Sequence, residues 1–468
     1  MARRWQRGLV AAMAVGSLVV VVSSDAGAAN APAKPLGVTW MRGFAAPGTP
    51  ARYDKVGVIK VGPSSAKNVL VLEPGTSAGS AYFVPLAKWI VSKTTGWQVW
   101  SVERRENLFE DQSELNLYKE GKATPTQLFD YYLGYIKNPA ITPHFQTIPN
   151  ASVAFAKQWG LNVAVQDLHS VITAAKKLGG KVVLGGHSLG GAVVTAYATW
   201  DFQGHAGADQ LAGLVYIDGG SGPTPEPTAT ADAALASLDA PQASPWLAFG
   251  GIAAPYAGIF VATGSAVALL DPDGASLGQA SGLLPSDIVP PVPVTNVGQF
   301  GYALNATTSP VTLLAAQAHL GTGLTAAGVV RGWNGAGALT PISRFATMFS
   351  GYPMKGVDGS EWYFPQRLTD DSGAVDEGNA NPAQKVLDVD ATMGHHLPKT
   401  LRIYAFGARL GGESVLQDAR VLAEQSHIPL SNLTLVNRHS TYSHNDPAGA
   451  YPDNVFFAHL VPFLKKIG

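Results

Sequence analysis

The segment over residues 181–191 constrains this chain more than any other. A short apolar strand runs into Gly-His-Ser-Leu-Gly at 186–190, and a helix rich in alanine and valine follows at once. A G-x-S-x-G sequence between a strand and a helix predicts a sharp turn that lifts the serine above the strand ends. Glycines flank such a turn because a Cβ atom would clash where the backbone passes closely. Ser188 is therefore the candidate nucleophile, and the alternative is a tight turn with an incidental serine.

Bulk composition limits the classes of protein that need to be considered. The chain has 468 residues, of which 46% are hydrophobic, so we expect a folded protein with a large core. The formal net charge is −1, which predicts no nucleic-acid partner. The absence of cysteine excludes disulfides, thiolate catalysis and thiolate metal sites.

The first residues follow the pattern of a secretory signal peptide. Arginines at positions 3, 4 and 7 precede an apolar stretch over 8–22, which is short for a membrane anchor. Small residues at 26–28, or alternatively at 29–31, offer a cleavage site. We therefore expect a signal peptide over 1–31, cleaved near Ala28 to Ala31, and a secreted, extracellular protein. An uncleaved N-terminal anchor is the alternative.

Apolar strands alternate with helices over two parts of the remaining chain. Strands are expected at 56–61, 68–72, 97–102, 182–186, 214–217, 401–406 and 433–436, and helices at 82–93, 161–178, 189–202, 413–425 and up to 466. This alternation predicts an α/β fold with a mostly parallel central sheet and helices on both faces. The ligand site of such a sheet lies beyond the carboxyl ends of its strands. The polar stretch over 106–151 is expected to be an irregular insertion.

The alternation stops over 221–398, a segment rich in alanine, glycine and proline. We interpret this segment as a large, mainly helical cap inserted before the last two strands, which leaves 32–220 and 399–468 as the catalytic domain. The uncharged stretch over 244–270 is long enough to span a membrane, but glycines and a proline interrupt it, so we expect buried cap helices. An apolar cap favours acyl or aromatic substrates. Contact of the cap with a lipid surface is a further expectation.

A serine hydroxyl needs an adjacent base, and histidine is suited to this role near neutral pH. On sheets of this type the partners follow the serine in the order acid, then histidine, so only a late histidine qualifies. His444 follows the last expected strand and is the preferred base, with His439 as the alternative. His187, inside the serine turn, is expected to point away from the site and to be a packing residue.

The acid partner is less clearly marked than the base. The loop after the strand at 401–406 holds no aspartate, and Glu413 is its nearest carboxylate. Asp218 follows the strand at 214–217, one strand away from Ser188. Asp218 is the preferred acid and Glu413 the alternative. Each also has a structural interpretation, Asp218 as a turn former and Glu413 as a residue favoured at a helix N-terminus.

Acyl transfer develops a negative charge on oxygen, which needs two preorganised backbone N–H donors. One donor is expected at Leu189, the residue after the nucleophile. The other is expected at Thr76, in the loop of small residues over 74–80, with Ser77 as the second choice. The alternative is that this loop is simply a glycine-rich connection.

Together these segments resemble a serine hydrolase of the α/β-hydrolase fold, of the esterase and lipase kind. The matching segments are the Pro-Gly-Thr loop at 74–76, the strand and turn at 97–105, the serine turn at 186–190, and His444 before the last helix. The resemblance implies cleavage of small-molecule or lipid carboxylic esters through an acyl-enzyme, with no cofactor and no metal. Two departures stand out: Pro-Gly replaces the usual His-Gly of the oxyanion loop, and the usual acid position is empty.

Two other functions remain open at this point. One is an amide or peptide hydrolase of aminopeptidase type, which would need a carboxylate to hold the substrate amine; acidic residues over 106–114 are candidates. The other is a catalytically inactive hydrolase fold that serves as a binding protein. A dehalogenase or an epoxide hydrolase is not expected, because those enzymes need aspartate where Ser188 stands.

Overall fold

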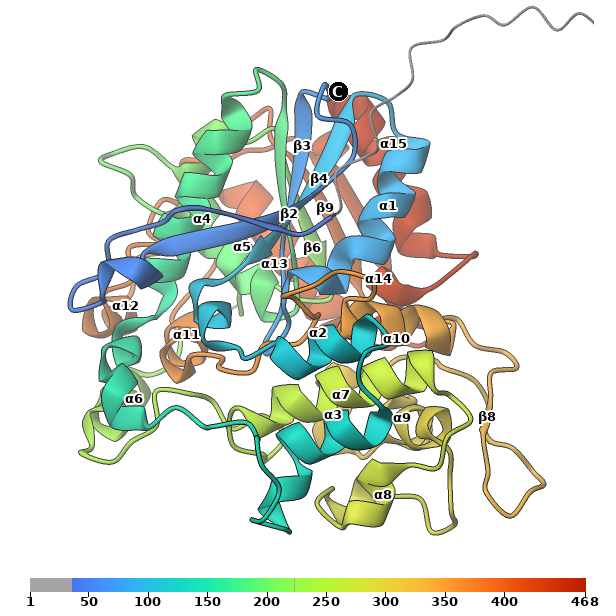
Figure 1. The fold of residues 1–468 in the computed structure, drawn as a ribbon. Coiled ribbons are helices and arrows are strands. Elements are labelled where there is room, and N and C mark those ends of the chain that lie inside the picture. The colour runs from blue at the N-terminus through green and yellow to red at the C-terminus, as the bar shows by residue number, and fades with distance from the viewer. Residues whose placement is uncertain (1–35, 223) are drawn as a thin grey trace, which may run out of the picture. The chain divides into compact units, whose positions relative to one another are not determined.

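An eight-stranded sheet organises the part of the chain that the computed structural model describes, residues 36–222 and 224–468 (Figure 1). The strands are β1 (Val38–Arg42), β2 (Lys55–Val61), β3 (Asn68–Glu73), β4 (Trp97–Glu103), β5 (Val182–His187), β6 (Gly213–Ile217), β9 (Arg402–Gly407) and β10 (Leu433–Asn437). They lie in the order β1-β2-β4-β3-β5-β6-β9-β10. The β1–β2 and β2–β4 pairs are antiparallel and the other neighbours are parallel. This is the α/β-hydrolase arrangement, so the predicted fold class is confirmed. The predicted signal peptide lies outside the described residues.

Helices cover both faces of the sheet (Figure 1). On one face lie α1 (Val84–Lys93) and α15 (Val455–Ile467), and their apolar side chains share one core with the sheet. On the other face lie α4 (Leu161–Lys176), α5 (Leu189–Thr199) and α13 (Gly412–Gln425), which share a second core with the sheet. The two cores explain why the central strands are apolar on both sides.

Strand β5, which carries the serine turn, shows how the sequence produces this layering. Val182 and Leu184 enter the core on the α4 side, and Val183 enters the core on the α1 side. Successive side chains of a strand point to opposite faces, so a continuous apolar run fills both cores at once. All three side chains are buried, which fixes the height at which the strand ends and Ser188 begins.

The regular structure of the segment between β6 and β9 consists mostly of helices. It contains α6 (Thr228–Asp239), α7 (Tyr256–Leu270), α8 (Leu277–Ser281), α9 (Asn296–Leu304), α10 (Ile342–Ser350), α11 (Gln366–Ser372), α12 (Pro382–Leu387) and the short pair β7 (Gly323–Leu324) and β8 (Trp333–Asn334). The uncharged stretch over 244–270 contributes α7, whose Ile259, Ala262 and Ala266 are buried in a third core. None of the helices that the structure describes is long and apolar enough to cross a membrane. The predicted domain boundaries at 220 and 399 stay a prediction.

The prediction that 106–151 is irregular was wrong in part. This stretch contains α2 (Ser113–Lys119) and α3 (Pro125–Tyr132), which lie beside α7 (Figure 1). Thr124 caps α3: its hydroxyl accepts from the Gln127 N–H at 3.2 Å, and the Gln127 side chain accepts from the Thr124 N–H at 2.8 Å. These reciprocal bonds and the proline at the first helical position stabilise a helix too short to show clear periodicity.

Candidate active site

The serine turn lies between β5 and α5. Ser188 has φ 57° and ψ −130°, a backbone conformation that is uncommon for a residue with a side chain and that is often found at functional sites. A Cβ atom on Gly186 would lie 2.1 Å from the Gly190 carbonyl oxygen, and one on Gly190 would lie 2.4 Å from that of Glu73. The predicted need for glycine on both sides of the serine is therefore confirmed.

His444 and Asp218 form a buried pair beside this turn. The His444 Nδ1 lies 2.6 Å from the Asp218 Oδ2, and both side chains are almost completely inaccessible to solvent. With Nδ1 donating to the carboxylate, Nε2 is the nitrogen left to accept a proton, and it has no hydrogen-bond partner among the described residues. His444 and Ser188 line the same pocket, which has an empty volume of about 600 Å³. We call this the catalytic pocket.

Asp218 is held at the end of β6 by backbone donors from the loop after β9. Its Oδ1 accepts from the Ala408 N–H at 2.6 Å and from the Gly411 N–H at 2.9 Å. Burial acts to raise the pKa of the Asp218 carboxyl, but the hydrogen bond and charge of His444, together with the Ala408 N–H, lower that pKa below its ordinary value. The carboxyl is therefore ionised at neutral pH. The loop after β9, where the resemblance would place the acid, instead supplies N–H groups that bind the acid at the end of the neighbouring strand β6.

The alternative residues lie elsewhere. Glu413 lies in the first turn of α13 and is exposed. Its carboxylate bonds to Asn437 at 2.6 Å and to Arg420 at 3.2 Å. His439 is exposed, and its Nδ1 lies 2.8 Å from the Asn437 side-chain oxygen. The structure thus brings Ser188, His444 and Asp218 together and brings neither alternative to that pair. Their catalytic roles stay predictions.

The expectation that His187 points away from the site was wrong. Its ring lies 4.3 Å from that of His444, centroid to centroid, and packs against Tyr82 on the other side at 5.2 Å. Burial, and then the charge of His444, lower the pKa of His187 to about 3, so the ring is neutral. Its Nε2 donates to the His444 carbonyl oxygen at 2.9 Å. This contact joins the serine turn to a loop 257 residues later in the chain, and no local pattern indicates it.

The predicted oxyanion donors lie next to Ser188 in the chain or line the pocket that it lines. Thr76 and Ser77 line the catalytic pocket, and Leu189 is the first residue of α5, where backbone N–H groups have no partner within the helix. Among the described residues, neither the Thr76 N–H nor the Leu189 N–H donates a hydrogen bond. A Cβ atom on Gly75 would lie 2.7 Å from the Ser188 Cβ, so glycine allows the loop to pass this close to the serine.

Arg104, a residue without an assigned role in the sequence analysis, fixes the shape of the loop over 74–78. Its guanidinium is buried; Nε bonds to Glu73 at 2.8 Å, Nη1 bonds to Glu361 at 2.6 Å, and Nη2 donates to the Pro74 carbonyl oxygen. The Glu361 N–H in turn donates to the Ser77 carbonyl oxygen at 3.0 Å. One buried cation and one strand-like contact from the segment before β9 therefore hold the loop that carries Thr76.

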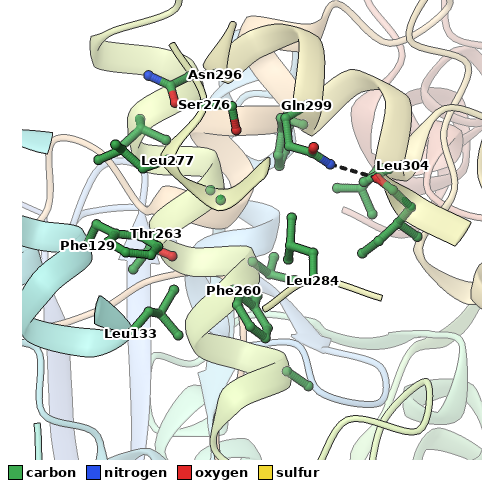
Figure 2. A pocket seen from close by; sticks show the side chains of 18 of the residues that line it. Phe129, Leu133, Phe260, Thr263, Ser276, Leu277, Leu284, Asn296, Gln299 and Leu304 are labelled. Carbon is green, nitrogen blue, oxygen red and sulfur yellow. Dashed lines mark hydrogen bonds between the residues drawn. The ribbon is translucent and has the colours of Figure 1, made fainter. Parts of the chain in front are cut away.

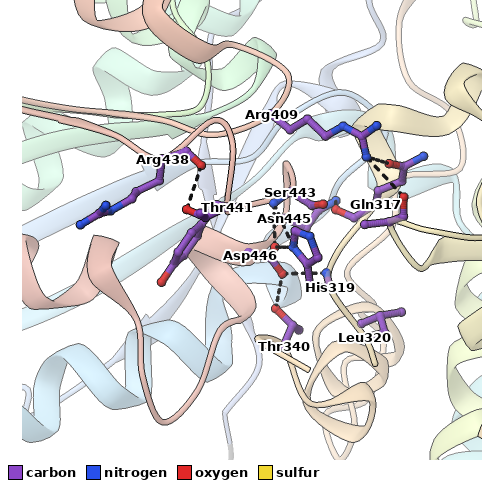
Figure 3. Close-up of polar contacts among 12 residues, drawn as sticks. Gln317, His319, Leu320, Thr340, Arg409, Arg438, Thr441, Ser443, Asn445 and Asp446 are labelled. Atoms are coloured by element: carbon purple, nitrogen blue, oxygen red, sulfur yellow. Dashed lines mark hydrogen bonds and ion pairs between the residues drawn. The ribbon is translucent and has the colours of Figure 1, made fainter. Parts of the chain in front are cut away.

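A second histidine–aspartate pair holds the loop that carries His444. Figure 3 shows His319, Thr340 and Ser443 converging on the buried Asp446. The Asp446 carboxylate bonds to His319 Nδ1 at 2.5 Å, and it accepts from the Thr340 hydroxyl and from the Ser443 N–H, each at 2.7 Å. Asp446 therefore ties the His444 loop to two residues of the segment between β6 and β9.

Asp446→Ala is expected to lower the free energy of unfolding by about 2–4 kcal/mol, because it leaves the Thr340 hydroxyl and the Ser443 N–H without their acceptor. Urea denaturation monitored by circular dichroism measures the change. Asp453→Ala, which removes an exposed carboxylate from the same part of the chain, is the control. A loss in Asp446→Ala no larger than in the control would contradict this account.

Neither a metal-binding group nor a matching protein sequence was found for this chain's described residues and its sequence, respectively. Among the described residues, no group of three or more His, Asp or Glu side chains is placed to hold a metal ion. No family model and no curated protein sequence matches the chain.

Several solved structures are similar at low identity. One is a candidate lipase from Sulfolobus solfataricus, with 14% identity, 92% of this chain and 93% of that chain covered, and a TM-score of 0.47. A carboxyl esterase from Bacillus coagulans has 10% identity, coverages of 93% and 99%, and a TM-score of 0.41. A monoacylglycerol lipase from Paleococcus ferrophilus has 13% identity, coverages of 88% and 99%, and a TM-score of 0.37. Similarities of this size carry no argument about activity, and the fold assignment rests on the strand order and the serine turn.

Proposed function

We propose that this chain is a serine hydrolase that cleaves carboxylic esters through an acyl-enzyme. The observation that carries the proposal is the buried hydrogen bond between Asp218 and His444, which leaves Nε2 unpartnered in the pocket that Ser188 also lines. A carboxylate on Nδ1 fixes the tautomer in which Nε2 accepts a proton, and it stabilises the imidazolium that forms.

In the first half of the reaction, the Ser188 hydroxyl oxygen attacks the ester carbonyl carbon while its proton passes to His444 Nε2. The negative oxygen that develops is stabilised by the Thr76 and Leu189 N–H groups. The bond between the carbonyl carbon and the alcohol oxygen then breaks, and the alcohol leaves with the proton from His444. The product is an ester of Ser188.

In the second half, His444 takes a proton from water, and the resulting hydroxide adds to the same carbonyl carbon. The bond to the Ser188 oxygen breaks, and His444 returns the proton to that oxygen. The net reaction converts one ester and one water into one acid and one alcohol, and the enzyme is regenerated.

The amide-cleaving alternative has less support. An aminopeptidase-like site needs a carboxylate that can bind the substrate amine, and the described residues that line the catalytic pocket include no aspartate or glutamate. An inactive binding protein would not need an ionised acid buried against a histidine whose Nε2 is free. Both observations favour ester hydrolysis.

Kinetics on paired substrates test the proposal. We expect kcat/KM for p-nitrophenyl butyrate to exceed that for butyryl p-nitroanilide, because p-nitrophenolate departs more readily than p-nitroaniline. Faster hydrolysis of the anilide would favour an amide or peptide hydrolase, and no turnover of either substrate would favour a binding protein.

Export after cleavage near Ala28 to Ala31 stays a prediction that N-terminal sequencing of the mature protein tests. Contact of the 221–398 segment with a lipid surface also stays a prediction.

A further inference from the structure

A second cavity, lined by the segment between β6 and β9 and by α3, adjoins the catalytic pocket. Its empty volume, which includes space open to solvent, is about 1080 Å³. Figure 2 shows side chains that line it, among them Phe129 from α3, Leu133 directly after α3, Phe260 from α7, and Leu284. No charged side chain of the described residues lines this cavity. We call it the apolar chamber.

The apolar chamber and the catalytic pocket share a boundary. Phe249, Ala257, Val261, Leu304 and Ala316 line both. These shared residues form the boundary between the two spaces, so an acyl chain bonded to Ser188 would enter the chamber by passing between them.

Helix α7 runs from the catalytic pocket into the apolar chamber. Ala257 and Val261 line both spaces, whereas Gly264 and Val267 line only the chamber. These four residues lie at the spacing that places side chains on one face of a helix. At 1.5 Å per residue, the face from Ala257 to Val267 spans about 15 Å. The chamber therefore extends along α7 beyond the part of the helix that lines the catalytic pocket.

Most of the polar side-chain atoms that line the apolar chamber are bonded to the protein. The Thr263 hydroxyl donates to the Ile259 carbonyl oxygen at 2.7 Å, and the Ser276 hydroxyl accepts from the Gln279 N–H at 3.2 Å. The side-chain amide of Gln299 donates to the Ile288 carbonyl oxygen at 2.7 Å, the bond drawn in Figure 2. The Gln299 Oε1 is the exception, since it has no hydrogen-bond partner among the described residues. With one uncharged polar atom left unpaired and no charge on the walls, the chamber is suited to a chain that is mostly hydrocarbon.

We propose that the apolar chamber binds the acyl chain of the ester substrate, so that the enzyme prefers esters of long, unbranched apolar acids. This inference rests on the proposed function. The acyl group stays bonded to Ser188 after the alcohol has left, until water releases it. An enclosed apolar site therefore stabilises the bound acyl group throughout the reaction. The alcohol, by contrast, must leave the site before water can react.

The first arm of the test measures the wild type on p-nitrophenyl esters of two to sixteen carbons. We expect kcat/KM to rise with acyl length by up to about fourfold per methylene, the value for full burial, and then to level off. Acetate esters of increasingly long alcohols are not expected to show this rise. A flat dependence on acyl length, or a rise with alcohol length instead, would overturn the proposal.

The second arm fills the chamber. Gly264 lines the apolar chamber, and a Cβ atom placed on it meets nothing closer than a Phe300 ring carbon at 4.0 Å. The chamber therefore has room for a larger side chain at this position. In Gly264→Leu, kcat/KM for the dodecanoate ester should fall about tenfold or more relative to the acetate ester, since several methylenes lose their site. The control is Ala233→Leu, which also introduces a leucine into the segment between β6 and β9 but places it on the exposed side of α6.

A binding measurement separates this inference from the proposed function. By isothermal titration calorimetry, dodecanoate should bind the wild-type protein more tightly than butyrate does, and Gly264→Leu should weaken dodecanoate binding. If the wild type hydrolyses no ester but shows this binding pattern, the proposed function fails and the chamber assignment stands. If esters are hydrolysed but dodecanoate binds no more tightly than butyrate, or Gly264→Leu affects both ligands equally, the chamber assignment is overturned.

Discussion

Ser188→Ala is expected to lower kcat for p-nitrophenyl butyrate by a factor of about 10⁴ or more, on the scale of nucleophile deletions in serine hydrolases. The reason is that the variant keeps the donors of the oxyanion site and the pocket but loses the only group that forms the acyl-enzyme in the proposed mechanism. Steady-state kinetics with purified variants measure the change.

The matched control for this variant is Ser92→Ala, which removes an exposed hydroxyl at the end of α1. Its kcat should stay close to that of the wild type. Urea denaturation should show that both variants are folded. A folded Ser188→Ala variant with kcat within tenfold of the wild type would remove Ser188 from the mechanism.

Asp218→Asn is expected to lower kcat by about 10⁴, as the equivalent change does in other triads, because an amide can offer an N–H to Nδ1 and so favour the wrong tautomer of His444. Glu413→Gln should leave kcat near the wild-type value, since the Glu413 carboxylate is exposed and bonded to Asn437 and Arg420. The pair of variants decides between the two acids that the sequence left open. A large loss in Glu413→Gln with little effect in Asp218→Asn would reverse the assignment.

The Asp218→Asn variant can also be tested through the pH dependence of its free energy of unfolding. Because the pKa of Asp218 is lowered in the folded protein, its ionised form contributes stability above the unfolded-state pKa, near 4, and this contribution is lost as pH falls through the lower folded-state pKa. The difference in unfolding free energy between the wild type and Asp218→Asn should therefore shrink on acidification below about pH 4. A difference that grows on acidification would contradict the ionised pairing with His444.

The sheet and the serine turn could be predicted from the sequence because their signals are local. Continuous apolar runs such as 182–186 mark strands that are buried on both faces, and the glycines around Ser188 mark a turn that tolerates no Cβ atom. The helices α2 and α3 were missed because each is short, and the Thr124 cap matters more to α3 than periodicity does.

The acid and the supports of the two loops could not be predicted, because they depend on contacts between distant parts of the chain. Asp218 directly follows β6 and Glu413 lies in the helix after β9, so both are at the carboxyl end of the sheet. The N–H groups at 408–412 and the position of His444 distinguish them. The bond from Arg104 to Glu361 spans 257 residues, and that from His319 to Asp446 spans 127. A single sequence contains no signal for such pairs.

Two segments of the chain between β6 and β9 thus hold the two loops of the candidate site. The segment around Glu361 contacts the loop of Thr76, and the segment around His319 contacts the loop of His444. The same part of the chain forms most of the apolar chamber. Substrate selection and the geometry of the site therefore depend on the same stretch of sequence, which is why the sheet alone does not define the activity.

Peptide mapping by mass spectrometry after reaction with a fluorophosphonate tests the central claim most directly. The probe forms a covalent bond with a serine that an adjacent histidine activates. The account predicts a single adduct on Ser188 in the wild-type protein and no adduct there in His444→Ala. Labelling of a different serine, or no labelling of the folded wild type, would contradict it.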